Sequence, residues 1–94
     1  MDYEIKKKRF DDVLSKVEEM VNGFNLDKRI CYIRLDYDEV HDKIDCNVFW
    51  NRMDALRMYS NQMGDSNTKI YDFIKGILGL KVGLYVHYDD CNRR

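Results

Sequence analysis

The chain has 94 residues, of which 45% are hydrophobic and 35% are charged, a balance typical of one soluble globular domain. Its 16 basic side chains nearly cancel its 17 acidic ones, which argues against a histone-like basic coat and against an acidic tail protein. No apolar run approaches the roughly 20 residues that cross a bilayer, and no apolar segment follows the charged start. We therefore expect one cytoplasmic domain over residues 1–94, with neither a membrane span nor a secretory signal.

The cysteines and the codon bias bear on where the protein works. Cys31, Cys46 and Cys91 are widely spaced and odd in number, so we interpret them as reduced thiols. The chain has no proline, and residues encoded by AT-rich codons dominate. This bias favours an AT-rich genome, such as that of a phage or a mobile element.

The first half of the chain shows two clear periodicities. Apolar residues recur every three or four positions from Phe10 to Phe24, which predicts a helix that begins near Asp2 and ends at Asn22-Gly23. From residue 30 to 38 the apolar period changes to two, which predicts a half-buried strand.

The second half contains one ambiguous segment. Residues 44–48 alternate as a returning strand of a hairpin would, although a helix that begins early, with Asp45 or Asn47 as its cap, is the alternative. We predict helices over residues 48–63 and from about 66 to 78, separated at Gly64, and a strand over residues 80–88. Residues 89–94 are expected to form a frayed tail.

These elements follow the order α-β-β-α-α-β. Three strands need cover on at least one face, and three amphipathic helices can supply it. The sequence therefore predicts the α+β class: a two-layer sandwich with a small, three-stranded, mainly antiparallel sheet covered by helices.

Acidic residues are concentrated in and around the predicted hairpin. Five acids fall within ten residues, beside a single lysine: Asp36, Asp38, Glu39, Asp42 and Asp45. Turns favour aspartate, so a solvated turn is one interpretation. The other is a surface that binds a basic partner by electrostatic complementarity, for example a host protein that processes nucleic acid.

A second candidate surface lies on the predicted helix 48–63. If Phe49 and Met53 face the core, Trp50 falls about 100° away, with Arg57 on the same flank and Met58 nearly opposite the core. These residue types are enriched at the energetic centres of interfaces. We predict that Trp50, Arg57 and Met58 contact a partner; the alternative is that Trp50 packs beneath the hairpin.

The order of elements resembles that of the bacterial (type II) KH domain, which implies RNA binding. KH domains clamp the nucleic-acid backbone with a GXXG loop between two adjacent helices. The corresponding junction in this chain is Met63-Gly64-Asp65-Ser66-Asn67-Thr68, which has one glycine and an aspartate where a phosphate would approach.

Catalytic and metal-binding patterns are weaker. His41 with Cys46 and His87 with Cys91 have spacings that zinc tolerates, but neither pair forms the usual tight knuckle. No nucleophile pattern, phosphate loop or pocket is evident. We predict no catalytic residues, no metal and no cofactor.

The sequence thus favours a small non-enzymatic interaction protein. We expect an inhibitor or regulator that binds a macromolecular partner, a protein rather than a nucleic acid, through the acidic hairpin and the Trp50 flank. The alternatives are a KH-like nucleic-acid-binding domain and a homodimeric structural or adaptor protein.

Overall fold

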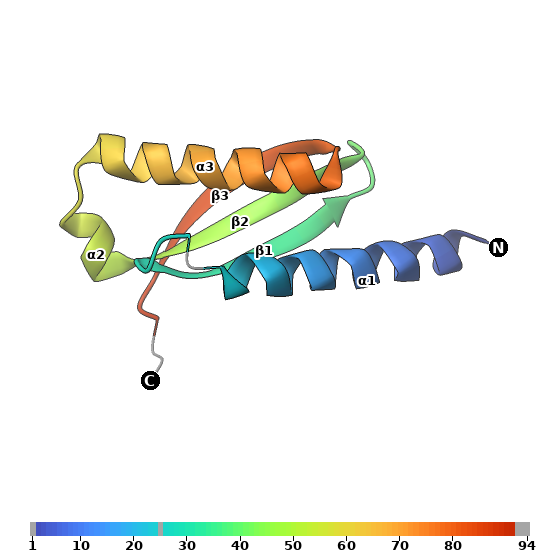
Figure 1. Ribbon diagram of the computed structural model, residues 1–94. Helices are drawn as coiled ribbons and strands as arrows, with labels where there is room; N and C mark the ends of the chain where they lie inside the picture. The colour runs from blue at the N-terminus through green and yellow to red at the C-terminus, as the bar shows by residue number, and fades with distance from the viewer. Residues whose placement is uncertain (1, 25, 92–94) are drawn as a thin grey trace.

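The computed structural model describes residues 2–24 and 26–91, with side chains from residue 7 onward. It contains three helices and three strands in the order α-β-β-α-α-β (Figure 1). The helices are α1 (Asp2–Gly23), α2 (Arg52–Leu56) and α3 (Ser60–Leu78); the strands are β1 (Ile30–Asp38), β2 (Lys43–Asn51) and β3 (Lys81–Asp89). The α+β class, the two layers and the element order are confirmed.

The strands form one mixed sheet in the order β1-β2-β3. β1 and β2 are an antiparallel hairpin, whereas β2 and β3 are parallel along their whole length, from Lys43 opposite Lys81 to Asn51 opposite Asp89. The expected mainly antiparallel sheet is therefore correct for only one of the two pairs. The reason is that α2 and α3 form a crossover that returns the chain to the hairpin end before β3 begins.

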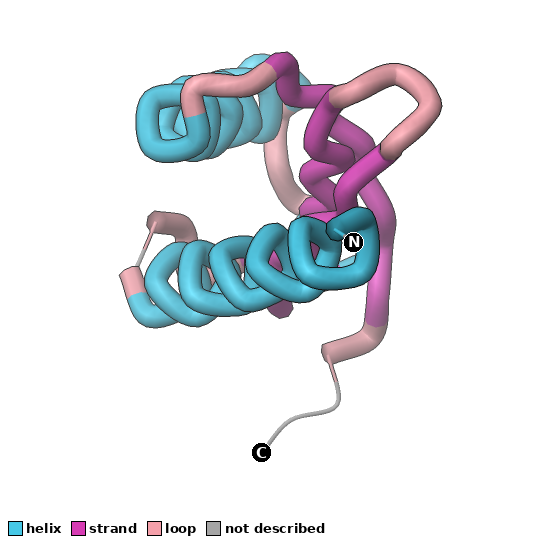
Figure 2. The backbone as a smooth tube through the Cα atoms, turned by 90° about the vertical axis from the view of Figure 1, so that its right-hand side faces the viewer, coloured by secondary structure: helices cyan, strands magenta, loops and turns pink. Residues whose placement is uncertain are grey.

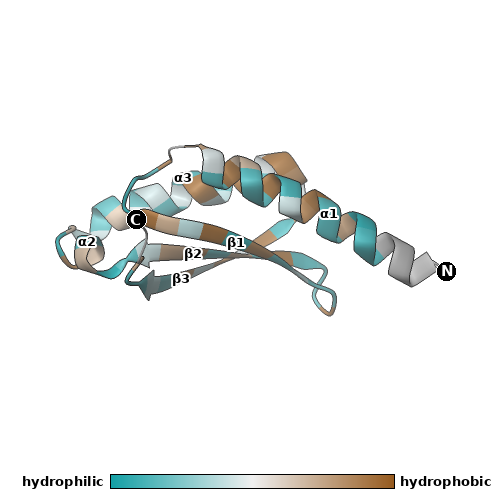
Figure 3. Ribbon diagram, turned by 90° about the horizontal axis from the view of Figure 1, so that it is seen from below, coloured by the Kyte–Doolittle hydropathy of each residue, from teal (hydrophilic) through white to brown (hydrophobic). Residues whose placement is uncertain are grey.

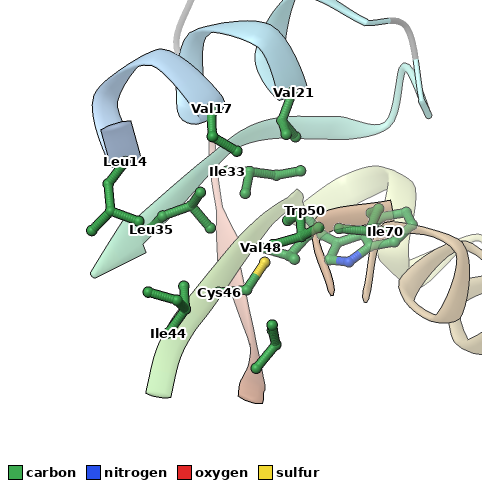
Figure 4. Packing of buried hydrophobic residues seen from close by; sticks show 12 residues of the cluster. Leu14, Val17, Val21, Ile33, Leu35, Ile44, Cys46, Val48, Trp50 and Ile70 are labelled. Atoms are coloured by element: carbon green, nitrogen blue, oxygen red, sulfur yellow. The ribbon is translucent and has the colours of Figure 1, made fainter. Parts of the chain in front are cut away.

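One hydrophobic core lies between the helices and one face of the sheet. Figure 1 shows α3 running along β2 and β3 while α1 lies beside β1. The even-numbered residues of β2, from Ile44 to Trp50, are fully buried and form the centre of this core (Figure 4). Helix α1 contributes Leu14, Val17 and Val21, and α3 contributes Ile70 and Ile74.

The predicted boundary between the second strand and the next helix is wrong. β2 continues to Asn51, because the alternation of apolar residues persists through Val48 and Trp50, and aromatic and β-branched residues favour the pleated sheet. Only one short helical segment follows, capped by Asn51, whose side chain accepts a hydrogen bond from the Asp54 backbone N–H at 3.0 Å. The helix then ends, and residues 57–59 form a short non-helical connection to α3.

Helix α3 begins earlier than predicted and runs through Gly64. Its first turn is closed by the Gln62 side chain, which accepts a hydrogen bond from the Tyr59 backbone N–H at 3.2 Å. Gly64 is exposed and has no neighbour within 4 Å of where a Cβ would stand, so it lowers helix propensity without ending the helix. Gly79 ends α3 in the left-handed conformation (φ 64°), directly after residue 78, the predicted end of this helix.

The loop between α1 and β1 is fixed by a charged pair. Asp27 receives two hydrogen bonds of 2.9 Å from the Arg29 guanidinium and one of 2.8 Å from the Ser66 hydroxyl of α3. The bonds from Arg29 outweigh burial and lower the pKa of Asp27 to about 2. The loop is therefore tied to the helix layer by an ionised carboxylate.

The cysteines differ from expectation. Cys31 and Cys91 form a disulfide with their Cα atoms 5.4 Å apart, so the prediction of reduced thiols is wrong for these two. Cys46 is free and buried, and burial raises its pKa to about 12. The expected frayed tail is also wrong at residues 89–91, because β3 includes Asp89 and the disulfide holds Cys91; residues 92–94 lie outside the described part.

The described residues include no helix with both the length and the apolar character needed to cross a bilayer.

Candidate functional site: the acidic hairpin and the open sheet face

The structure brings all five predicted acids together at one end of the sheet. Asp36 and Asp45 lie directly opposite each other in the β1–β2 register, and Asp38 lies opposite Lys43. Glu39 and Asp42 belong to the turn, which stands apart from both long helices in Figure 2. We call residues 38–42 the hairpin tip. The prediction that these acids are neighbours is confirmed, whereas their role in binding stays a prediction.

The two opposed acids, Asp36 and Asp45, are compensated by neighbouring cations. Arg34 contacts Asp36 at 3.1 Å, and Lys43 contacts Asp45 at 3.2 Å. Opposed like charges destabilise a sheet, so these pairs relieve the repulsion between Asp36 and Asp45. The charge of this part of the hairpin is therefore largely balanced.

The two aspartates of the hairpin tip have different partners. Asp38 accepts hydrogen bonds from the Val40 and His41 backbone N–H groups, and its second oxygen lies 2.8 Å from His41 Nδ1. The contact with His41 lowers the pKa of Asp38. Asp42 accepts a 2.6 Å hydrogen bond from the Tyr37 hydroxyl, which raises the pKa of that tyrosine. Within the described residues, neither aspartate contacts a lysine or an arginine.

An apolar side chain stands among these charges. Val40 is 85% exposed, more than the other large hydrophobic residues among the described side chains. The turn around it is held by the Asp38 hydrogen bonds and by a positive φ of 50° at Asp42, a conformation that aspartate tolerates. The hairpin tip is therefore an ordered turn that presents one valine beside ionised carboxylates.

The second predicted surface is not formed. Trp50 is 0% exposed, and its indole donates a 3.0 Å hydrogen bond to Asn67 of α3, so its placement on an exposed helix flank is wrong. Met58 packs against the core, which also contradicts its predicted position. Arg57 is exposed but follows α2, at the far end of β2 from the hairpin. The prediction failed because it assumed a helical period at residue 50, which lies on strand β2.

A row of aromatic rings crosses the face of the sheet that the helices leave uncovered. Tyr32 stacks on Phe49 with ring centroids 4.3 Å apart, and Phe49 stacks on His87 at 4.5 Å. Arg34 lies 5.5 Å from the Phe49 centroid, and Asn47 contacts His87 at 2.9 Å. Sequence reasoning missed this row, because it depends on the register of three strands. The alternation in β1 and β3 was the available signal, but Phe49 was assigned to a helix.

A groove of about 740 Å³ lies between α1 and β1. Phe10 and Leu14 of α1 and Tyr37 of β1 line it, together with the polar groups of Glu18 and Arg34. Phe10 and Tyr37 stack with centroids 4.2 Å apart on its apolar side. The expectation that the chain has no cavity of this size is therefore wrong.

The residues considered for zinc are not assembled. His41 is at the hairpin tip, Cys46 is in the core and Cys91 is in the disulfide. Among the described residues no group of three or more potential ligands is placed to hold a metal ion.

The segment that would correspond to the KH-type loop does not lie between two helices. Residues 63–68 lie inside α3, and the chain between α2 and α3 is Arg57-Met58-Tyr59, without glycine. The resemblance is therefore limited to the order of elements.

Comparison with known proteins gave no relative: no family model, no curated protein and no solved structure matches the chain.

Proposed function

We propose that this chain is a small non-enzymatic binding protein, an inhibitor or regulator, that contacts a protein partner through its hairpin tip. The observation that supports this proposal is the ordered turn in which Val40 is 85% exposed beside the carboxylates of Asp38 and Asp42. An apolar recess of a partner that covered this side chain would remove apolar surface from water, which favours association.

The chemistry of the hairpin tip defines the partner. Its carboxylates suit a basic surface, and Val40 suits an apolar recess within that surface. The hydrogen bonds from Val40, His41 and Tyr37 to the two aspartates order the turn before binding, so little conformational entropy is lost on association. Because the attraction is electrostatic, the association rate should fall as the salt concentration rises.

A pair of charge-matched variants tests the proposal. The hairpin variant combines Asp38→Asn, Glu39→Gln and Asp42→Asn, each of which keeps one acceptor oxygen and removes the charge. The control variant makes the same three types of substitution at exposed acids of the helices: Asp12→Asn, Glu19→Gln and Asp72→Asn. Both variants change the net charge equally, so any difference between them reports the location of the charge.

The measurement is affinity capture on immobilised protein from a bacterial cell extract, with and without nuclease treatment. We expect a protein that the wild-type chain and the control variant retain equally and that the hairpin variant retains at least about tenfold less, as for the loss of 1.4 kcal/mol of binding free energy. Equal retention by all three chains, or retention that disappears with nuclease, contradicts the proposal.

The aromatic row supports a second candidate function, the binding of single-stranded nucleic acid by base stacking. Tyr32, Phe49 and His87 already stack on one another, so only the ends of the row offer an open ring face. The neighbouring acids also repel phosphates. Titration of a fluorescent single-stranded oligonucleotide separates the two functions. We expect the wild-type chain not to bind the oligonucleotide at physiological salt. Binding by the wild-type chain that is lost in Phe49→Ala would favour the nucleic-acid-binding function.

The cytoplasmic location stays a proposal, and one of the observations that supported it is lost. It relied on reduced cysteines, and the Cys31–Cys91 disulfide is typical of oxidising compartments. Alkylation of thiols in intact cells before purification tests the location, because a chain kept in the cytoplasm should yield modified Cys31 and Cys91.

A further inference from the structure

The two outer strands of the sheet differ in how their free edges are covered. On β1, the Asn22 side chain of α1 bonds both backbone groups of Ile33, at 2.8 and 2.9 Å, and Glu18 accepts the Leu35 N–H at 2.7 Å. Helix side chains thus occupy the positions that a further strand would use. The free edge of β1 is protected against pairing.

The free edge of β3 lacks this protection. β3 is the other outer strand of the sheet, as Figure 3 shows. Within the described residues, the backbone of β3 receives one side-chain hydrogen bond, from Arg52 to the Tyr88 carbonyl at 3.5 Å. Tyr85, Val86 and Tyr88 are 43%, 36% and 51% exposed. The strand has nine residues and carries formal charges only at its two ends, so it has the properties of an edge that pairs.

The sequence of β3 is complementary to itself in one antiparallel register. When Tyr85 lies opposite the Tyr85 of a second copy, all nine residues pair, and Lys81 at one end faces Asp89 at the other. The same register keeps apolar neighbours together on the helix side, with Val82 opposite Tyr88 and Leu84 opposite Val86. If the two strands were instead centred on residue 84 or 86, each side chain would stay on the same face of the sheet, but Lys81 would no longer lie opposite Asp89.

We propose that the chain forms a homodimer by antiparallel pairing of two β3 strands around Tyr85, which joins the two sheets into one of six strands. Two symmetry-related pairs of Lys81 with Asp89 close the ends of the interface. The occupant of this edge is thus a second copy of the chain, because the charges of the strand match those of its own reverse and the free edge of β1 is covered. The inference goes beyond the proposed function and uses none of the hairpin-tip residues.

A charge swap tests the register. Lys81→Asp alone places two carboxylates at each end of the interface, and Asp89→Lys alone places two ammonium groups there. We expect each single variant to weaken the dimer at least about tenfold, since attraction at both ends becomes repulsion. The double variant Lys81→Asp/Asp89→Lys should restore it. The control is Lys69→Asp on the exposed surface of α3, which should leave association unchanged.

The mass in solution is the readout. Sedimentation velocity over a micromolar concentration series should show wild-type chain passing from 11.4 kDa to twice that mass. Circular dichroism of each variant shows whether it is folded. A wild-type chain that stays monomeric at every concentration overturns the proposal. The free edge of β3 would then be open to pairing with a strand of another protein. A dimer that neither single variant weakens overturns it as well, because another surface then forms the contact.

Cross-linking locates the two-fold axis independently of charge. With Tyr85→Cys, the two introduced thiols meet across the axis and should form an intermolecular disulfide on mild oxidation. With Lys16→Cys, at an exposed position of α1, which packs on β1 at the opposite edge of the sheet, we expect no covalent dimer. Equal cross-linking of both variants would contradict the proposed axis.

Discussion

Replacing Trp50 with alanine tests the main difference between the sequence and the structure. The side chain is fully buried and is among the largest in the core, and its indole nitrogen donates to Asn67 at 3.0 Å. Truncation removes the apolar contacts and leaves a cavity, which together destabilise a protein by about 3–5 kcal/mol. A domain of this size has about 5–15 kcal/mol in total, so the loss is a large part of its stability.

The expected drop in Tm for Trp50→Ala is on the order of 20 °C, since 1 kcal/mol corresponds to about 4–8 °C in small domains. Thermal and urea denaturation followed by circular dichroism measure it. The control is Leu56→Ala, which also truncates an apolar side chain but at a position 76% exposed, and should change stability by less than about 0.5 kcal/mol.

Fluorescence adds a test that needs no variant. Trp50 is the only tryptophan, so the emission of the native chain should be blue-shifted and resistant to iodide quenching until the protein unfolds. A loss below about 1 kcal/mol for Trp50→Ala, with emission typical of water in the native chain, would refute the assignment to the core and restore the sequence-based interpretation.

Three other contacts give further expected outcomes. Reduction of Cys31–Cys91 should lower Tm, because the bond closes a loop across 60 residues and removes about 4 kcal/mol of unfolded-state entropy in the chain-entropy estimate; Tm with and without reductant measures it. Asn22→Ala should cost about 1–3 kcal/mol and speed hydrogen exchange at the Ile33 amide, since both hydrogen bonds of that backbone unit are lost; unchanged exchange would contradict the edge-covering role. The pKa of Asp27 is lowered to about 2, so its ionised form stabilises the fold above pH 3.8 and this contribution is lost as the pH falls towards 2. Asp27→Asn should therefore cost at most about 2 kcal/mol at neutral pH and flatten the stability profile between about pH 4 and pH 2.

The parts of the fold that the sequence predicted well have one uninterrupted period. α1 was predicted from Asp2 to Gly23 and is observed there, and β1 likewise matches its predicted residues 30–38. In the segment 48–63 the apolar residues fit a period of two up to Trp50 and a helical period from Phe49 onward. Which of the two periods applies depends on which side chains of this segment are buried, and the neighbouring strands of the sheet determine that. The error at this boundary then moved Trp50 from the core to a surface.

The candidate site divides in the same way. The acids of the hairpin are close in sequence, so a turn between two strands was enough to bring Asp36 and Asp45 together. The aromatic row needs three strands in register, and β3 joins β2 only after a crossover of two helices. The register cannot be read from a local pattern, so neither the stack on Phe49 nor the uncovered edge of β3 was predictable from the sequence.

The two proposals together have a geometric consequence. Lys43, which follows the hairpin tip, lies opposite Lys81, so the tip is at the end of the sheet where β3 begins. An antiparallel pairing of two β3 strands therefore places the two tips at opposite ends of the joined sheet. Strands of nine residues are about 30 Å long, so one small partner cannot contact both tips, whereas an array of partners can. On a surface densely coated with the partner, a dimer bound through one tip can bind a second partner molecule through its other tip. This second contact is intramolecular and strengthens retention of the dimer. Asp89→Lys, at the end of β3 away from the tip, should accordingly weaken binding to the dense surface and leave binding to the same partner free in solution unchanged.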